Sequence, residues 1–248
     1  EILRCLVGSE MCIRDSPNDL TATNGVSAQN WGGNRARPDL IRKFFPQNDA
    51  PELPSYDMYV AAKDDRALFD GVGRTLNNED VSTFKSGYAI AKFTNFKTDG
   101  SAGHDATFAD TDYFLLRVAE AYLTFAEADA RLNGGNTTSE GTQAVNSIRS
   151  RAHASTRTNA YSLDDICDEW SREFYFEGRR RMDLIRFNRY GGNNNYTWQW
   201  KGGSYEGRSF DAHLNIFAIP TNELTANSNL TQNCLLYTSP SPRDISGS

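Results

Sequence analysis

Cysteine is scarce in this 248-residue chain, which has four cysteines and also only three histidines. Cys5, Cys12 and Cys234 lie in terminal segments that we expect to be foreign to the protein, for the reason given below. Cys167 remains, beside apolar neighbours in a helical pattern, and is interpreted as a small buried hydrophobic residue. The sequence therefore predicts no disulfide framework. The histidines share no ligand spacing, so no metal site is predicted from them.

Other scarcities exclude further classes of function. Basic residues do not predominate, because 26 lysines and arginines stand against 32 acidic residues and the net charge is −6. Nucleic-acid binding depends on neutralising phosphates, so this chain is not expected to bind nucleic acid. No run approaches the roughly 18 apolar residues of a membrane-spanning helix. The GxSxG, Walker and dinucleotide-binding signatures are also missing, so none of these enzyme classes is indicated.

The two ends of the chain are related to each other at the DNA level. Codons for residues 6–16 can be written so that their reverse complement, read in a shifted frame, encodes residues 234–243. Two natural segments would almost never share this relation, so we interpret both ends as a translated sequencing adapter. We expect residues 1–16 and 234–248 to be non-native and residues 17–233 to be a gene fragment truncated at both ends. That stretch keeps 23 basic and 28 acidic residues, a net charge of −5.

Helical periodicity is strongest in three segments. Alanine and leucine recur on one face over residues 113–132, and Gly134-Gly135 follows as a stop signal. The second segment is 139–152, and the third is 162–176, where Ser162 can cap the amino end. The alanine-rich faces predict that the first two helices form a close antiparallel hairpin, as in tetratricopeptide-type repeats, and that it packs against the third.

The remaining sequence predicts little regular structure. A short helix is expected at 38–45 because a proline precedes apolar residues at helical spacing. The alternating, aromatic-rich stretch 87–96 predicts a strand. An Asn/Gly-rich loop is expected over 190–213. The Asp-rich segment 98–112 lacks the EF-hand pattern and is interpreted as a solvated loop, with calcium binding left open. We expect no other cofactor.

Four stretches in this order resemble the carboxy-terminal half of the SusD/RagB family. They are LLRVAEAYLTFAEADARLN (115–133), FYFEGRRRMDLIRF (174–187), NYTWQWKGG (195–203) and IFAIPTNELTANSNLTQN (216–233). The weaker stretch NWGGNRARPDLI (30–41) fits the preceding region of the family. The likeness covers essentially all of residues 17–233.

The resemblance implies a mainly α fold, the carboxy-terminal part of a SusD-like tetratricopeptide-type domain with long irregular loops and few short strands. It implies a cell-surface glycan-binding protein of the bacterial outer membrane, lipid-anchored in the full-length form and without catalytic activity. The expected partners are an oligosaccharide and a TonB-dependent, SusC-like transporter. With helices of the family missing, we also expect an exposed apolar face on the hairpin.

Trp31 is the first candidate for a sugar platform. It stands in a loop-like stretch, and proteins hold sugars by stacking an aromatic ring on the apolar face and hydrogen-bonding its hydroxyl rim. Asn30, Asn34 and Arg35 are the predicted rim donors. The alternative is that Trp31 fills the junction between a loop and a helix.

Tyr196, Trp198 and Trp200 are secondary candidates. Their segment resembles a feature common to family members that bind different glycans. It is therefore expected to support the fold or meet the transporter more than to select a sugar.

Two other function classes compete with glycan binding. Glu173, Glu177 and Asp183 would supply the paired carboxylates of a glycoside hydrolase. However, arginines interleave with them at helical spacing, so an ion-pair lattice is the favoured interpretation. The third class is a tetratricopeptide-type protein-interaction module without a sugar site.

Overall fold

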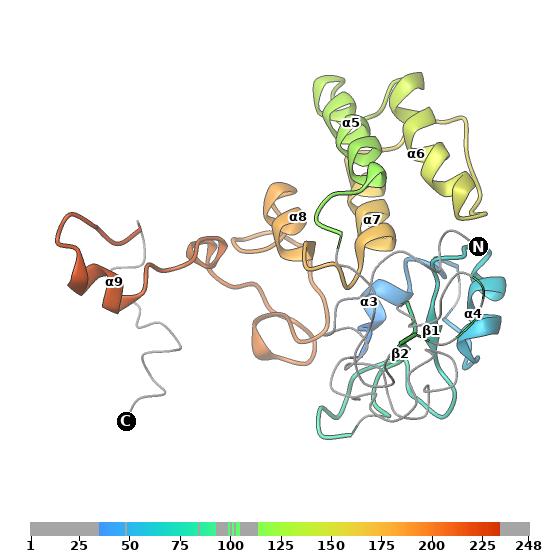
Figure 1. Cartoon of the computed structure of the whole chain (residues 1–248), viewed down its shortest axis with the longest axis horizontal. Helices are drawn as coiled ribbons and strands as arrows, with labels where there is room; N and C mark the ends of the chain where they lie inside the picture. The colour runs from blue at the N-terminus through green and yellow to red at the C-terminus, as the bar shows by residue number, and fades with distance from the viewer. Residues whose placement is uncertain are drawn as a thin grey trace. The chain divides into compact units, whose positions relative to one another are not determined.

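The computed structural model describes residues 35–47, 49–83, 85–92, 99, 101, 103–104 and 114–233. The chain forms two compact units, unit 1 through Arg180 and unit 2 from Arg181. The described part is helical with two short strands, so the expected mainly α fold is confirmed (Figure 1). Among the described residues, no helix combines the length and the apolar character that a membrane crossing requires.

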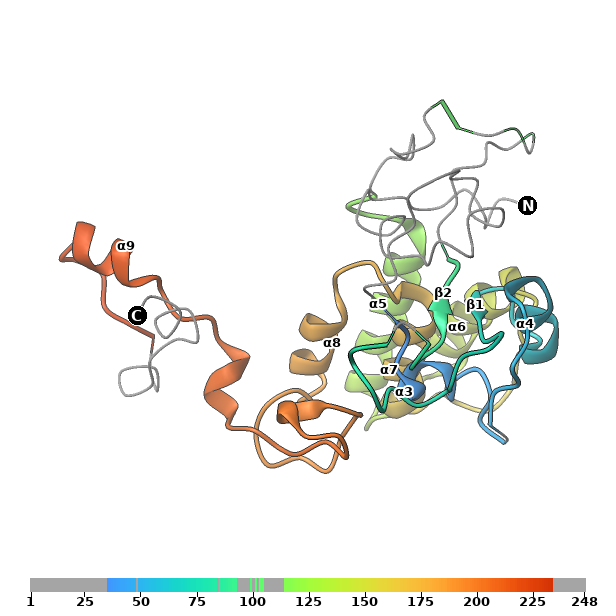
Figure 2. The same ribbon diagram turned by 90° about the horizontal axis from the view of Figure 1, so that it is seen from below.

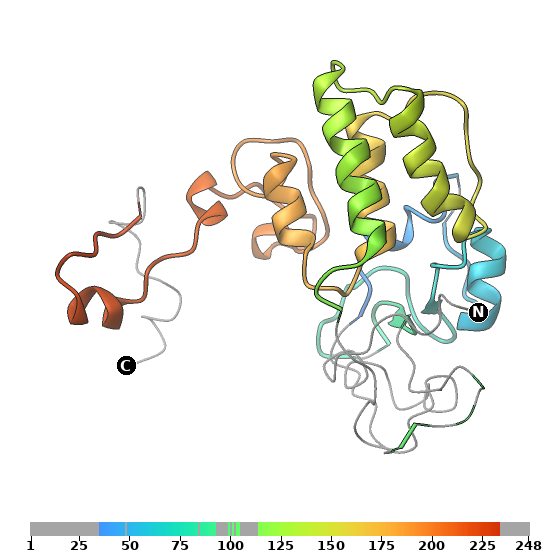
Figure 3. The same cartoon turned by 45° about the horizontal axis from the view of Figure 1, so that its top comes forward.

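Three helices of unit 1 pack together (Figures 1 and 3). α5 (Val118–Leu132) and α6 (Ser139–Arg151) form a hairpin, and α7 (Leu163–Phe174) packs against α5. Ala126 and Ala130 of α5 are fully buried, and such small side chains let helices approach closely. The predicted hairpin and its packing on the third helix are both confirmed.

Local sequence explains where these helices begin and end. The Ser162 hydroxyl accepts a hydrogen bond from Asp165 N–H, and the Asp165 carboxylate accepts one from Ser162 N–H, which makes a capping box at the start of α7. Thr138 caps α6 through Gly141 N–H. After α5, Gly135 adopts a φ of 93° and donates to the Ala130 carbonyl at 2.8 Å, a conformation that favours glycine.

A second layer of unit 1 contains α3 (Pro38–Ile41), α4 (Ser55–Ala62) and a small antiparallel ladder (Figure 2). The ladder pairs β1 (Phe69–Asp70) with β2 (Ala89–Ile90). The largest side chains of this layer form one apolar cluster, made by Ile41, Phe44, Met58, Phe69, Tyr88, Ile90 and Tyr175 together with smaller residues.

Unit 2 has less regular structure. α8 (Arg180–Arg186) leads into a long loop with the short helices η3 (Lys201–Gly203) and η4 (Ala212–Asn215), and α9 (Thr221–Ala226) follows. The expectation of an irregular loop over 190–213 is confirmed.

Several elements differ from the prediction, and β1 and α9 are among those that were not predicted. α5 begins at Val118 and not near 113, because Arg117 is extended (φ −144°, ψ 153°) and its guanidinium group reaches buried glutamates. α3 ends at Ile41 and continues as turns to residue 44. α4 was not predicted. The strand over 87–96 is confirmed at Ala89–Ile90, and residues 93–96 lie outside the described residues.

Candidate functional site

The densest polar feature of unit 1 is a buried set of ion pairs on α7. Glu169 and Glu173 lie on this helix and Glu177 follows it, and all three are at most 8% exposed. Arg66 joins the first two, with Nη1 at 2.7 Å from Glu169 and 3.1 Å from Glu173. It also pairs bidentately with Asp64. We call the whole set the carboxylate lattice, which consists of Asp64, Arg66, Lys92, Arg117, Arg149, Arg151, Glu169, Arg172, Glu173 and Glu177.

Each of the three glutamates in the carboxylate lattice faces at least two cations at 2.5–3.1 Å. The pairs are Glu169 with Arg66, Arg149 and Arg172, Glu173 with Arg66, Arg117 and Arg151, and Glu177 with Lys92 and Arg117. Such multiple pairing offsets the large cost of removing carboxylates from water.

The lattice keeps Glu169 and Glu173 ionised. Burial alone would raise the pKa of Glu173, but the surrounding guanidinium charges, that of Arg66 above all, lower it to about 2. Burial would likewise raise the pKa of Glu169, and its arginine partners hold it well below the usual range. The general acid of a glycoside hydrolase needs a raised pKa so that a proton is available near neutral pH. Glu169 and Glu173 instead have lowered pKa values, so neither holds a proton to donate near neutral pH.

The ion-pair interpretation is therefore confirmed, but most of the expected partners were wrong. Glu173 and Glu177 were expected to pair with arginines within helical spacing. Instead, their partners come from far along the chain: Arg66, Lys92, Arg117 and Arg151. In unit 2, Asp183 pairs locally with Arg186 at 2.9 Å. Sequence spacing reveals only pairs on one helix, whereas helix packing brings the distant cations together.

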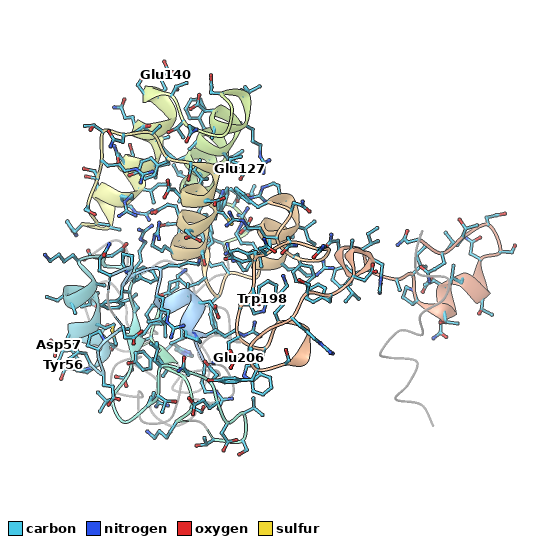
Figure 4. All side chains as sticks on the ribbon, turned by 180° about the vertical axis from the view of Figure 1, so that it is seen from behind. Tyr56, Asp57, Glu127, Glu140, Trp198 and Glu206 are labelled. Carbon is cyan, nitrogen blue, oxygen red and sulfur yellow. The ribbon has the colours of Figure 1, made fainter. Side chains whose placement is uncertain are left out.

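Two further residues of α7 are buried. Trp170 is 1% exposed and donates its indole N–H to Glu127 of α5 at 3.0 Å; Glu127 is labelled in Figure 4. Glu127 also accepts from Arg131 at 2.9 Å. Cys167 is fully buried, as expected for a small hydrophobic residue.

The predicted glycan platform lies only partly within the described residues. Three of its four members lie outside them: Asn30, Trp31 and Asn34. The guanidinium group of Arg35 donates to the carbonyls of Thr83 and Val81, the latter at 3.3 Å. Ala36 N–H donates to the Tyr88 carbonyl at 2.8 Å. The backbone of Ala36 is thus anchored to Tyr88, next to β2, and the side chain of Arg35 is anchored to the turn at 81–83.

The glycine at position 87 makes this anchoring possible. Gly87 has a φ of 106°, and a Cβ there would lie 3.0 Å from Cβ of Arg35 and closer still to the Asn78 side chain. Residue 87 therefore has to lack a side chain, so that its backbone can lie this close to Arg35 and Asn78.

The secondary candidates form a packed aromatic cluster in unit 2. The rings of Tyr190 and Trp198 stack with centroids 6.1 Å apart and an interplanar angle of 22°. Phe210 meets both rings edge to face, and Tyr196 lies 6.2 Å from Trp198. We call these four residues the aromatic cluster; Trp198 is labelled in Figure 4. Their ring faces are largely engaged with one another, which suits a packing role.

Lys201 organises this cluster, and sequence reasoning did not identify it. It is 1% exposed, and its ammonium group donates to the carbonyl of Tyr196 and, at 3.2 Å, to Asn194 Oδ1. The same group lies 4.6 Å from the centroid of Trp198 and 5.5 Å from that of Phe210. Burial lowers the pKa of Lys201, and the oxygen acceptors and cation–π contacts offset that cost.

Trp200 packs apart from the aromatic cluster. It meets Tyr205 edge to face with centroids 5.7 Å apart and adopts a left-handed φ of 67°. Such a conformation is uncommon for a bulky residue. Gly202, with a φ of 62°, follows in the same turn, where a Cβ would lie 2.8 Å from the Arg208 carbonyl. The surrounding turn therefore holds Trp200 in a defined position.

The Asp-rich segment is described only in part. Asp99 accepts hydrogen bonds from Ser101 N–H and Oγ at 2.9 and 2.6 Å, which is a local turn. The other candidate calcium ligands, Asp105, Asp110 and Asp112, lie outside the described residues. Within the described ranges, no three His, Cys, Asp or Glu residues gather as a metal site.

Comparison with known sequences identifies close similarity to one family. The model of the SusD family matches residues 64–237. A curated relative, the starch-binding protein SusD of Bacteroides thetaiotaomicron, is 37% identical over 245 residues. The match covers 86% of this chain but only 42% of the relative, so the chain spans less than half of that protein's length.

Comparison with solved structures supports the same fold. A SusD-like protein from Bacteroides fragilis aligns with a TM-score of 0.62 at 20% identity, over 94% of this chain and 51% of the other. A laminarin-binding SusD-like protein aligns with a TM-score of 0.53 at 22% identity, over 92% and 44% of the two chains.

Proposed function

The chain belongs to the SusD family, and from that membership we propose that it binds oligosaccharides without cleaving them. The observation that carries this proposal is the family match over residues 64–237, together with 37% identity to a protein named for starch binding. The carboxylate lattice supports the non-catalytic part, because it holds Glu173 ionised among several arginines.

We further propose that the bound glycan is passed to a TonB-dependent, SusC-like transporter. The protein would then act at the cell surface, held at the outer membrane by a lipid anchor. These features follow from the family resemblance.

Trp31 is the proposed sugar platform, with Asn30, Asn34 and Arg35 as rim donors. An indole ring offers a flat apolar face to a pyranose ring, and amide and guanidinium groups hydrogen-bond to its hydroxyls. The hydrogen bond from Ala36 N–H to the Tyr88 carbonyl supports this assignment, since a fixed backbone next to the platform pre-organises a shallow binding surface.

Affinity electrophoresis through gels that contain single polysaccharides tests this function. The intact chain is expected to be retarded by at least one member of a panel that includes starch and laminarin. Loss of a stacked aromatic costs about 1–3 kcal/mol, which abolishes retention on a weak site. Trp31→Ala should therefore migrate freely while keeping its helical circular dichroism signal.

Trp198→Ala is the matched control, because it removes the same side chain from the aromatic cluster. It should lower stability with little change in retardation. Normal retardation of Trp31→Ala together with free migration of Trp198→Ala would reverse the assignment of the two aromatic regions.

The hydrolase alternative makes a different prediction. An enzyme would release reducing ends from a polysaccharide, and Glu173→Gln or Glu177→Gln would stop that release. Turnover with this dependence would overturn the binding-only function.

A further inference from the structure

The turn that joins α5 to α6 begins with an asparagine followed by a glycine. Asn133 comes directly after α5, and both it and Gly134 are exposed. Gly134 adopts a left-handed φ of 67°. Glu140, labelled in Figure 4, lies in the first turn of α6 on the other side. An asparagine side chain in front of a glycine can be attacked by the next backbone nitrogen, because glycine carries no side chain that hinders the approach.

The backbone nitrogen of Gly134 is available for such an attack. Asn133 N–H donates to the Asp129 carbonyl at 3.1 Å, and Gly135 N–H donates to the Ala130 carbonyl at 2.8 Å. Between them, Gly134 N–H donates to no residue in the part of the chain that the structure describes. Inside a helix, a carbonyl four residues earlier would hold this amide. The end of α5 therefore leaves the Gly134 nitrogen unbonded at an exposed position.

The side chain of Asn133 closes the end of α5. Its amide nitrogen donates to the Asp129 carbonyl at 2.7 Å and to Asp129 Oδ1 at 3.1 Å. The same carboxylate accepts from the N–H and hydroxyl of Thr138 at 2.6 and 3.0 Å. Because Thr138 caps α6, the Asp129 carboxylate joins both ends of the turn, and Asn133 supplies one of its hydrogen-bond donors.

We propose that Asn133 deamidates spontaneously and that the product loosens this turn. The Gly134 nitrogen gives up its proton to water and bonds to Cγ of Asn133, while the carboxamide nitrogen takes up a proton and leaves as ammonia. Water then opens the resulting cyclic imide at one of its two carbonyl carbons, which yields aspartate or isoaspartate. No oxidant or reductant takes part. The inference is independent of glycan binding.

The product is unfavourable at this position for two reasons. A carboxylate at residue 133 replaces the amide donor and places a second negative charge four residues after Asp129, a spacing at which like charges destabilise a helix. It also adds negative charge at the carboxy-terminal end of α5, where the helix dipole is already negative. Isoaspartate in addition lengthens the main chain between residues 133 and 134 by one methylene group. The modification should therefore weaken the junction between the two helices.

Peptide mapping of the folded chain tests the proposal. The chain is incubated at about pH 8 under conditions in which its helical circular dichroism signal persists. Trypsin cleaves after Arg131 and Arg149, so one peptide holds Asn133 and two controls that no glycine follows, Asn136 and Asn146. Mass spectrometry locates each deamidation in this peptide and compares it with a zero-time sample. Asn133 should convert at least tenfold faster than either control.

Two glycine variants test the identity of the attacking atom. Gly134 and Gly135 both have a positive φ, and a Cβ at either would meet no atom within 4 Å. Gly134→Ala and Gly135→Ala therefore impose a similar backbone strain, but only Gly134→Ala places a methyl group beside the attacking nitrogen. It should slow conversion at Asn133 at least tenfold, and Gly135→Ala should not. Equal conversion of Asn133 and Asn136 in the folded wild type, or equal conversion in the two variants, would overturn the proposal.

The effect on the turn is measured with Asn133→Asp, which reproduces the aspartate product. Loss of the amide donor and the added charge should lower its thermal unfolding midpoint by about 2–4 °C. Asn136→Asp makes the same change in charge at an exposed position before α6, where the helix dipole favours negative charge, and should not lower the midpoint. A midpoint for Asn133→Asp no lower than that for Asn136→Asp would show that deamidation does not loosen the turn.

Discussion

At the scale of single residues, Arg66 shows how one buried cation joins distant parts of the chain. Its guanidinium group contacts Asp64 beside it and Glu169 and Glu173 more than a hundred residues away. Arg151 adds a further cation from α6 to Glu173. Removing one member of such a lattice leaves the others buried and uncompensated, which is far more costly than the loss of an exposed ion pair.

Glu173→Gln should accordingly destabilise unit 1 by about 3–5 kcal/mol at pH 7. The pKa of Glu173 is about 2 against an ordinary value of 4.5, so its stabilising contribution is complete above about pH 4.5 and is lost as the pH falls toward 2. Urea unfolding of the wild type should therefore show a loss of about 3 kcal/mol over that range that the variant lacks. Glu140→Gln, at an exposed position of α6, is the control. Parallel pH profiles for wild type and Glu173→Gln would contradict the assignment.

Lys201→Met should disorganise the aromatic cluster. The change keeps most of the side-chain volume but leaves the Tyr196 carbonyl and Asn194 Oδ1 without their buried donor, at a cost of about 1–3 kcal/mol. The near-ultraviolet circular dichroism of the tryptophans should weaken, while the far-ultraviolet helical signal stays. Lys63→Met, an exposed change, controls for the loss of charge. An unchanged aromatic spectrum would show that Lys201 does not organise these rings.

At the scale of elements, Ala126 and Ala128 form a matched pair on α5. Ala126 is buried, and Ala128 is exposed two residues later. Ala126→Leu should cost about 1–3 kcal/mol, because the inserted atoms force neighbouring helices apart. Ala128→Leu should be within about 0.5 kcal/mol of wild type, as expected for an exposed site. Chemical denaturation of both variants measures the difference. Equal costs would mean that the hairpin does not pack as described.

The elements also show which features the sequence could predict. α6 and α7 were predicted nearly to the residue, because caps such as Ser162 and a clear apolar face act locally. α4 was missed because it is short and lacks a strong apolar face; the burial of Met58, a tertiary contact, stabilises it. The start of α5 was placed too early because Arg117 is held extended by glutamates almost sixty residues away.

For the candidate site too, the sequence indicated local features but not contacts between residues far apart in the chain. Trp31 and the segment with Tyr196, Trp198 and Trp200 were chosen as candidates from local composition, that is, from aromatic residues among glycines and amides. It did not reveal Lys201, since an isolated lysine in a loop carries no local sign that it will be buried under two rings. Nor did it reveal the distant partners of Glu173, because such pairing depends on how the helices pack.

At the scale of the whole molecule, we propose that the native sequence is confined to residues 17–233. The two terminal segments, 1–16 and 234–248, lie outside the described residues. Deleting both should leave the free energy of unfolding within about 0.5 kcal/mol of the intact chain, as for neutral surface changes. Urea denaturation of the shortened chain provides the measurement. A loss of several kcal/mol would show that these segments belong to the folded protein.

The most direct test of non-catalytic glycan binding follows the sugar itself. The chain is dialysed to equilibrium against defined oligosaccharides from each retarding polysaccharide, and the sugar on both sides is then recovered and sized by chromatography. Our account predicts an excess of oligosaccharide on the protein side, recovered at its original length after prolonged incubation, and no excess with Trp31→Ala. Shortened products would contradict the non-catalytic role, and the absence of any excess with a folded wild-type chain would contradict binding.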